Sequence, residues 1–120
     1  MTVRRLKTYT SETGAVYQYY FVGKRPALAN DPAAPAVEFI FDVVSDRKPT
    51  FAVTVFLRQE ATAAWQEQHG RMLVDTEHYA AAKMKLFRGF DQIEDVMNDG
   101  RRLTIGLEEL EELLAQLGVD

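Results

Sequence analysis

The stretch "VEFIFDVVSDRKPTFAVTVFL" (residues 37–57) decides the fold. Apolar residues alternate along 37–43 and again along 51–57, which is the period of a β-strand with one buried face. The turn "SDRKPT" lies between the two segments, and Pro49 fits there because a turn residue can lack a backbone N–H. We therefore predict an antiparallel pair of strands over 37–44 and 51–57, the best-buried part of a sheet. The residues expected on its core face are Val37, Phe39, Phe41, Val43, Phe51, Val53, Val55 and Leu57.

A second pair of strands is predicted upstream. "VRRLKTYT" (3–10) and "VYQYYFVG" (16–23) are rich in β-branched and aromatic residues, and "SETGA" between them offers Gly14 for a positive φ. Alternation puts aromatic residues at 17, 19 and 21 on one face, and apolar residues at 16, 20 and 22 on the other. Because both faces are apolar, we expect that something covers each of them or that one face binds a partner. Residues 24–36 contain three prolines and no periodicity, so we predict a loop there.

Helices are predicted after residue 57, where the apolar period changes from two to 3.6. The first spans 58–69, with Ala61, Ala64 and Trp65 inward, and ends at Gly70. The second spans 76–97, capped by Asp75, with 74 and 79 at the spacing of a hydrophobic staple and residue 89 as a weak point. A short extended piece at 101–105 and a leucine-striped helix over 107–117 complete the chain.

Strands therefore precede helices, which predicts an α+β fold. We expect one domain over residues 1–120, with a four-stranded antiparallel sheet made of two hairpins and two to three helices packed on one of its faces.

The composition and motifs exclude several kinds of chemistry. Because the chain has no cysteine, it can hold neither disulfides nor thiolate metal sites. The two histidines, two serines and seven glycines form no HExxH, nucleophile-elbow, GxGxxG or GxxxxGK pattern, so we predict no metal, cofactor or catalytic residue. No apolar run is long enough to span a bilayer and no signal peptide is present, so we expect a cytoplasmic protein without membrane contact.

Charge is distributed unevenly along the chain, whose net charge is −4. Residues 1–25 carry five basic and one acidic side chain, whereas residues 91–120 carry two basic and nine acidic ones. The basic first hairpin is therefore expected to lie against the acidic last helix, in the same chain or in a second subunit.

Lys83 interrupts an apolar helix face in "YAAAKMKLFRGFDQI" (79–93). Three interpretations are open. Its stem packs on the neighbouring rings while the ammonium reaches water; or it forms a buried ion pair with Glu38 or Asp42; or it is a functional lysine with a lowered pKa on the floor of a pocket.

The first hairpin combines positive charge with flat rings and gives the candidate interaction surface. Its residues are Arg5, Lys7, Tyr17, Tyr19, Phe21 and Lys24. This composition is typical of platforms for single-stranded nucleic acid, although the same rings also suit a small core.

Residues 51–90 place one alternating strand before a short helix, a turn and a longer helix. In this order the segment resembles the ribbon-helix-helix family. The resemblance implies a dimer whose strands read the DNA major groove, here through the outward residues Ala52, Thr54 and Phe56.

Taken together, these features favour a non-enzymatic protein-interaction or small-ligand-binding module. We expect it to act as a homodimer through the aromatic hairpin or the leucine-striped helix. The alternative is a nucleic-acid-binding protein that uses the basic hairpin or residues 51–90, and the third is an enzyme with a pocket around Lys83.

Overall fold

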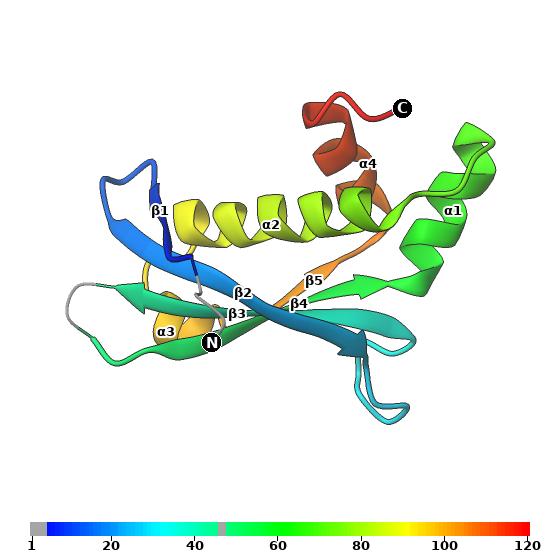
Figure 1. The fold of residues 1–120 in the computed structure, drawn as a ribbon. Helices are drawn as coiled ribbons and strands as arrows, with labels where there is room; N and C mark the ends of the chain where they lie inside the picture. The colour runs from blue at the N-terminus through cyan, green and yellow to red at the C-terminus, as the bar shows by residue number, and fades with distance from the viewer. Residues whose placement is uncertain (1–4, 46–47) are drawn as a thin grey trace.

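The computed structural model describes residues 5–45 and 48–120, and it is an α+β fold as predicted (Figure 1). A five-stranded sheet has the order β1-β2-β3-β4-β5. The strands are β1 (Lys7–Thr10), β2 (Val16–Pro26), β3 (Ala36–Ser45), β4 (Phe51–Arg58) and β5 (Arg102–Ile105). The helices are α1 (Gln59–His69), α2 (Asp75–Gln92), α3 (Val96–Asp99) and α4 (Leu107–Gln116).

The expectation of four strands is wrong, because residues 102–105 form a fifth. The first four strands are antiparallel as predicted, whereas β5 pairs in parallel with β4. Helices α1 to α3 carry the chain from the end of β4 back to its start, so the next strand must run in the same direction. β5 lies within the short extended piece predicted at 101–105, and its Leu103 and Ile105 are buried; the prediction did not include its pairing with β4.

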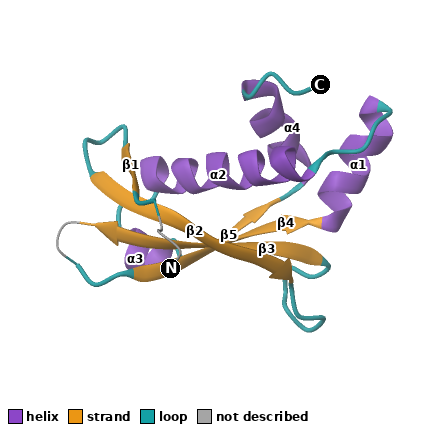
Figure 2. Cartoon of the chain, in the orientation of Figure 1, coloured by secondary structure: helices purple, strands orange, loops and turns teal. Residues whose placement is uncertain are grey.

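The core lies between the sheet and helices α1, α2 and α4, which pack on one face (Figure 2). The alternation predicted for 37–57 is confirmed, since Phe41, Val43, Val53 and Val55 are fully buried on that face. The turn between the strands lies partly outside the described residues, at 46–47. The leucine stripe of α4 is also confirmed as a buried face, through Leu110, Leu113 and Leu114.

Helix α2 differs from its prediction at both ends. It begins at Asp75, so Val74 takes the N-cap position, and the side chain of Val74 is exposed and forms no staple. Glu77 stabilises this end instead, because its carboxylate accepts the N–H of Val74 at 3.0 Å. The helix ends at Gln92 rather than 97, where Ile93 becomes extended before α3 begins.

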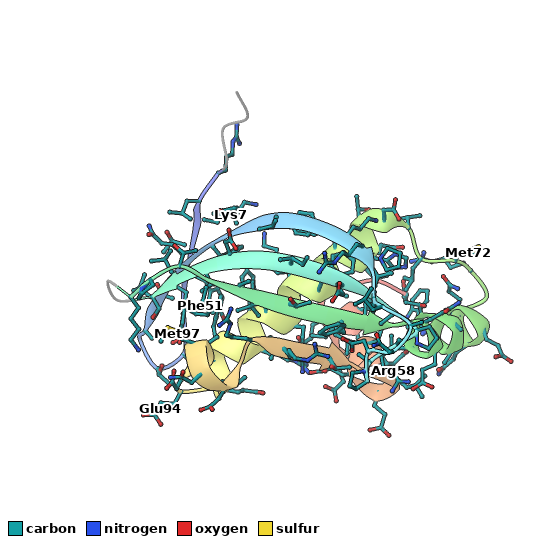
Figure 3. All side chains as sticks on the ribbon, turned by 90° about the horizontal axis from the view of Figure 1, so that it is seen from below. Lys7, Phe51, Arg58, Met72, Glu94 and Met97 are labelled. Atoms are coloured by element: carbon teal, nitrogen blue, oxygen red, sulfur yellow. The ribbon has the colours of Figure 1, made fainter. Side chains whose placement is uncertain are left out.

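The loop predicted for 24–36 is shorter, because β2 continues through Pro26. Residues 27–35 fold over one end of the sheet face opposite the helices. There the Arg102 guanidinium lies 4.2 Å from the ring centroid of Phe56 and donates to the Asp31 carboxylate at 2.8 Å. Val16, which alternates with the buried Tyr17 and so lies on this face, is exposed. Figure 3 shows the molecule from this side.

The acidic residues of α4 pair with the other helices, so the expected contact with the basic hairpin is wrong within the chain. Glu109 binds Lys85 at 2.8 Å and Arg88 at 3.1 Å. Glu111 lies 2.7 Å from His69 of α1. Among the helices that the structure describes, none has the length and apolar character needed to cross a membrane.

Candidate interaction groove

The outer edge of β2 is paired along only part of its length. β1 covers it from Lys7 opposite Tyr19 to Thr10 opposite Val16. On its inner side β2 pairs with β3 as far as Pro26. Within residues 5–45 and 48–120, no strand lies against the outer edge of residues 21–26. This edge can therefore accept a further strand.

An apolar hollow lies beside this edge, between β2 and the first turns of α2. Its volume is about 340 Å³. We call it the β2–α2 groove; it is lined by Phe21, Lys24, Phe39, Asp75, Thr76 and Tyr79. The Phe21 ring packs edge-on against Tyr79, with centroids 4.9 Å apart, yet 38% of Phe21 stays exposed. A large apolar side chain left open at a strand edge is suited to contact with a partner.

The rim of the groove is an ion pair at the surface. The Lys24 ammonium lies 3.5 Å from the Asp75 carboxylate, and both side chains are largely exposed. Such a pair contributes at most about 1 kcal/mol, so an incoming ligand can displace Lys24 at little cost.

Lys83 lies one helical turn beyond Tyr79, at the end of the groove nearest β1. Its ammonium is 5.9 Å from the ring centroid of Tyr19 and 5.8 Å from that of Phe87. Burial is the main cause that lowers the pKa of Lys83, and the positive charge of neighbouring Lys7 lowers that pKa further. In the described part of the chain, no carboxylate lies within ion-pair distance of Lys7 or Lys83. Among the described residues, these two ammonium groups therefore lie close together without a carboxylate counter-ion.

The predicted ion pair between Lys83 and Glu38 or Asp42 is wrong, because both carboxylates lie on the opposite face of the sheet. Glu38 accepts a hydrogen bond from Arg25 at 2.7 Å. Asp42 accepts one from the Tyr20 hydroxyl at 2.6 Å. The ammonium of Lys83 lies near the rings of Tyr19 and Phe87, and Lys83 stands beyond the lining of the β2–α2 groove rather than on its floor.

The six residues predicted as an interaction surface divide into three pairs. Tyr17 and Tyr19 are only 4% and 3% exposed, because α2 covers them. Tyr17 stacks on Phe90 of α2 with centroids 4.2 Å apart, so its ring is not available to stack on a nucleic-acid base. Lys7 and Arg5 are exposed at the start of β1, where Figure 3 labels Lys7. Phe21 and Lys24 line the groove.

The ribbon-helix-helix interpretation of residues 51–90 is wrong. The expected order of strand, helix and helix is present, but β4 lies between β3 and β5 and has no edge for a second copy to pair with. Phe56, one of the outward residues, is covered by loop 27–35 and fully buried.

A second hollow of about 370 Å³ lies at the far end of β2, and sequence reasoning gave no sign of it. Pro26, Val37 and Leu57 contribute to its lining. His78 also lines it, and the Nε2 atom of His78 is buried without a hydrogen-bond partner among the described residues. Burial is the main cause that lowers the pKa of His78.

Across residues 5–45 and 48–120, no three His, Cys, Asp or Glu side chains are grouped as a metal site requires.

Comparison of the chain with protein-family models, with curated proteins and with solved structures gave no match.

Proposed function

We propose that this protein is a non-enzymatic protein-interaction module that binds an extended peptide segment in the β2–α2 groove. One observation carries the proposal: a strand edge without a partner strand in the described part of the chain lies directly beside an open apolar hollow. In strand addition, the edge supplies backbone hydrogen bonds and an adjacent pocket accepts a side chain of the ligand. The groove supplies both features within a few residues of β2.

A partner of a different kind fits the edge better than a second copy does. The register of β2 shifts between Phe21 and Gly23, and Lys24, Arg25 and Pro26 follow. A bulge, basic side chains and proline are devices that prevent two identical edges from pairing. Three of the leucines expected to offer a dimer interface, Leu110, Leu113 and Leu114, are in the core, whereas Leu107 and Leu117 at the two ends of the stripe are exposed. Homodimer formation through the hairpin stays a prediction.

The proposal is tested by selection of random peptides on the purified protein. One library is displayed with free carboxyl termini and the other as internal segments, and the selected peptides are labelled for fluorescence anisotropy. Binding is then compared between wild type and two variants, Phe21→Ser in the groove and Val16→Ser on the opposite face. The two positions are comparably exposed, at 38% and 45%. Circular dichroism establishes that both variants fold.

We expect Phe21→Ser to weaken peptide binding roughly 10- to 100-fold, since loss of a buried aromatic contact is worth about 1.5–3 kcal/mol. Val16→Ser should leave binding unchanged. Selection without enrichment, or equal binding by wild type and Phe21→Ser, would overturn the proposal. Light scattering during size exclusion addresses the alternative occupant: a dimer that Phe21→Ser dissociates would assign the groove to a second copy of the chain.

A further inference from the structure

We propose that the β2–α2 groove is specific for the carboxyl terminus of its peptide, whose terminal carboxylate is held between the ammonium groups of Lys7 and Lys83. This inference rests on the proposed function. It adds the direction of the peptide and the chemistry of its end.

Strand polarity gives the direction. β1 runs antiparallel to β2 and enters the sheet at Lys7, opposite Tyr19 (Figure 1). A peptide that adds antiparallel to residues 21–26 of β2 runs in line with β1, from a position opposite Pro26 towards one opposite Phe21. A longer chain in this direction would meet the start of β1. The free edge therefore suits a segment that ends there.

Charge selects the same orientation. The peptide's last residue arrives beside Lys7, which pairs with Tyr19, and Lys83, whose ammonium lies 5.9 Å from the ring centroid of Tyr19; neither lysine has a carboxylate partner in the described part of the chain. A carboxylate placed there relieves the repulsion between the two ammonium groups, and its attraction is strengthened because the rings of Tyr19 and Phe87 exclude water from one side. A peptide added in the parallel direction would bring its amino terminus to the same two positive charges. That orientation is disfavoured.

Spacing places the apolar anchor of the peptide. Tyr79 and Lys83 are one turn apart on α2, which corresponds to about 6 Å along the helix axis. An extended chain advances about 3.3 Å per residue, so the hollow lies roughly two residues before the terminal carboxylate. A cavity of about 340 Å³ beside Phe21 and Phe39 accepts one large aliphatic or aromatic side chain. The expected ligand has a large apolar side chain within its last three residues. It ends in a free carboxylate.

The decisive experiment compares one selected peptide in two forms, with a free carboxyl terminus and with a carboxyl-terminal amide, by fluorescence anisotropy. We expect amidation to raise the dissociation constant at least tenfold. Lys83→Met should raise the dissociation constant of the carboxylate form by a similar factor and leave that of the amide form nearly unchanged. Lys48→Met, which removes an exposed lysine outside the groove, is the matched control and should bind both forms as wild type does.

The possible results separate the two proposals. If peptides bind in a Phe21-dependent manner but amidation and Lys83→Met have no effect, peptide binding stands and the carboxyl-terminal inference is overturned. The inference is also overturned if internal segments bind as tightly as free carboxyl termini. If neither library yields a binding peptide, the proposed function itself fails.

Discussion

Gly89→Ala is expected to destabilise the protein, although alanine favours helices. Gly89 lies in α2 at a place where β5 passes closely beneath it. A Cβ atom there would stand 3.0 Å from Cδ1 of Leu103 and 3.7 Å from its Cδ2. In an exposed helix the change would stabilise by about 1 kcal/mol, whereas overpacking of a core costs about 1–3 kcal/mol. Leu103 is only 7% exposed and has little room to move, so we expect a net loss of about 1 kcal/mol.

A second substitution isolates the contact. Leu103→Val removes both δ-carbons and puts a β-branched residue in the strand, where such residues are favoured. In that background the added methyl group of Gly89→Ala no longer meets Leu103 at 3.0 Å. Only the gain in helix propensity remains, so Gly89→Ala should now stabilise by about 1 kcal/mol. The sign of the effect is therefore expected to reverse between the two backgrounds.

Urea unfolding of the four proteins measures this cycle. The single tryptophan, Trp65, is buried and its fluorescence reports the transition. Free energies of unfolding are compared at equal m-values. If Gly89→Ala stabilised the wild-type protein, our inference that α2 packs too closely on β5 to admit a methyl group would be wrong. If it destabilised both backgrounds equally, the cost would lie outside the Leu103 contact.

Three further predictions concern ionisable groups. Tyr9→Phe removes a 2.8 Å hydrogen bond to Asp91 and should cost about 1.5 kcal/mol in urea unfolding at pH 7. Burial is the largest cause, and that hydrogen bond the second, that raises the pKa of Tyr9 to about 12. The wild-type protein should therefore lose stability above pH 10, where the tyrosine ionises in the unfolded chain, and Tyr9→Phe should lose less. Burial lowers the pKa of His78 below 6.5, so the contribution of His78 to stability is present above that pH and is lost as the pH falls. His78→Leu should therefore reduce the change in unfolding free energy between pH 7 and pH 5. Lys83→Met should raise the urea midpoint, since it removes a half-buried charge beside Lys7.

The part of the fold that local periodicity encodes could be predicted from the sequence. Apolar residues alternate over 37–57, and leucines recur at helical spacing over 107–117. Both segments form the elements that these spacings predict. The extended piece at 101–105 could be predicted but its place in the sheet could not, because four residues give only two inward positions and their partner strand is distant in sequence. The continuation of β2 to Pro26 depends on pairing with β3 rather than on any pattern of its own.

The candidate site could be predicted only in part, and the missing step is geometric. Tyr17, Tyr19 and Phe21 follow the same alternation, so the sequence does not distinguish them. The position of α2 over the sheet makes the difference: it covers the first two rings and leaves the third at the open edge. Tyr79 is expected on an apolar helix face, but its contact with Phe21 joins two segments that no linear motif connects.

Lys83 differs from its neighbour Lys85 in a way that bears on function. Lys85 has a carboxylate partner, Glu109, at 2.8 Å, as expected for a lysine that stabilises the packing of two helices. Lys83 is half-buried, stands beside another ammonium group and has no such partner in the described residues, so its charge costs stability in the free protein. An anionic ligand that binds beside Lys83 would offset this cost in stability, and such a ligand explains why a lysine stands there. Lys83→Met should then unfold at higher urea and yet bind the peptide carboxylate more weakly, whereas a half-buried lysine without a role in ligand binding would show the first change without the second.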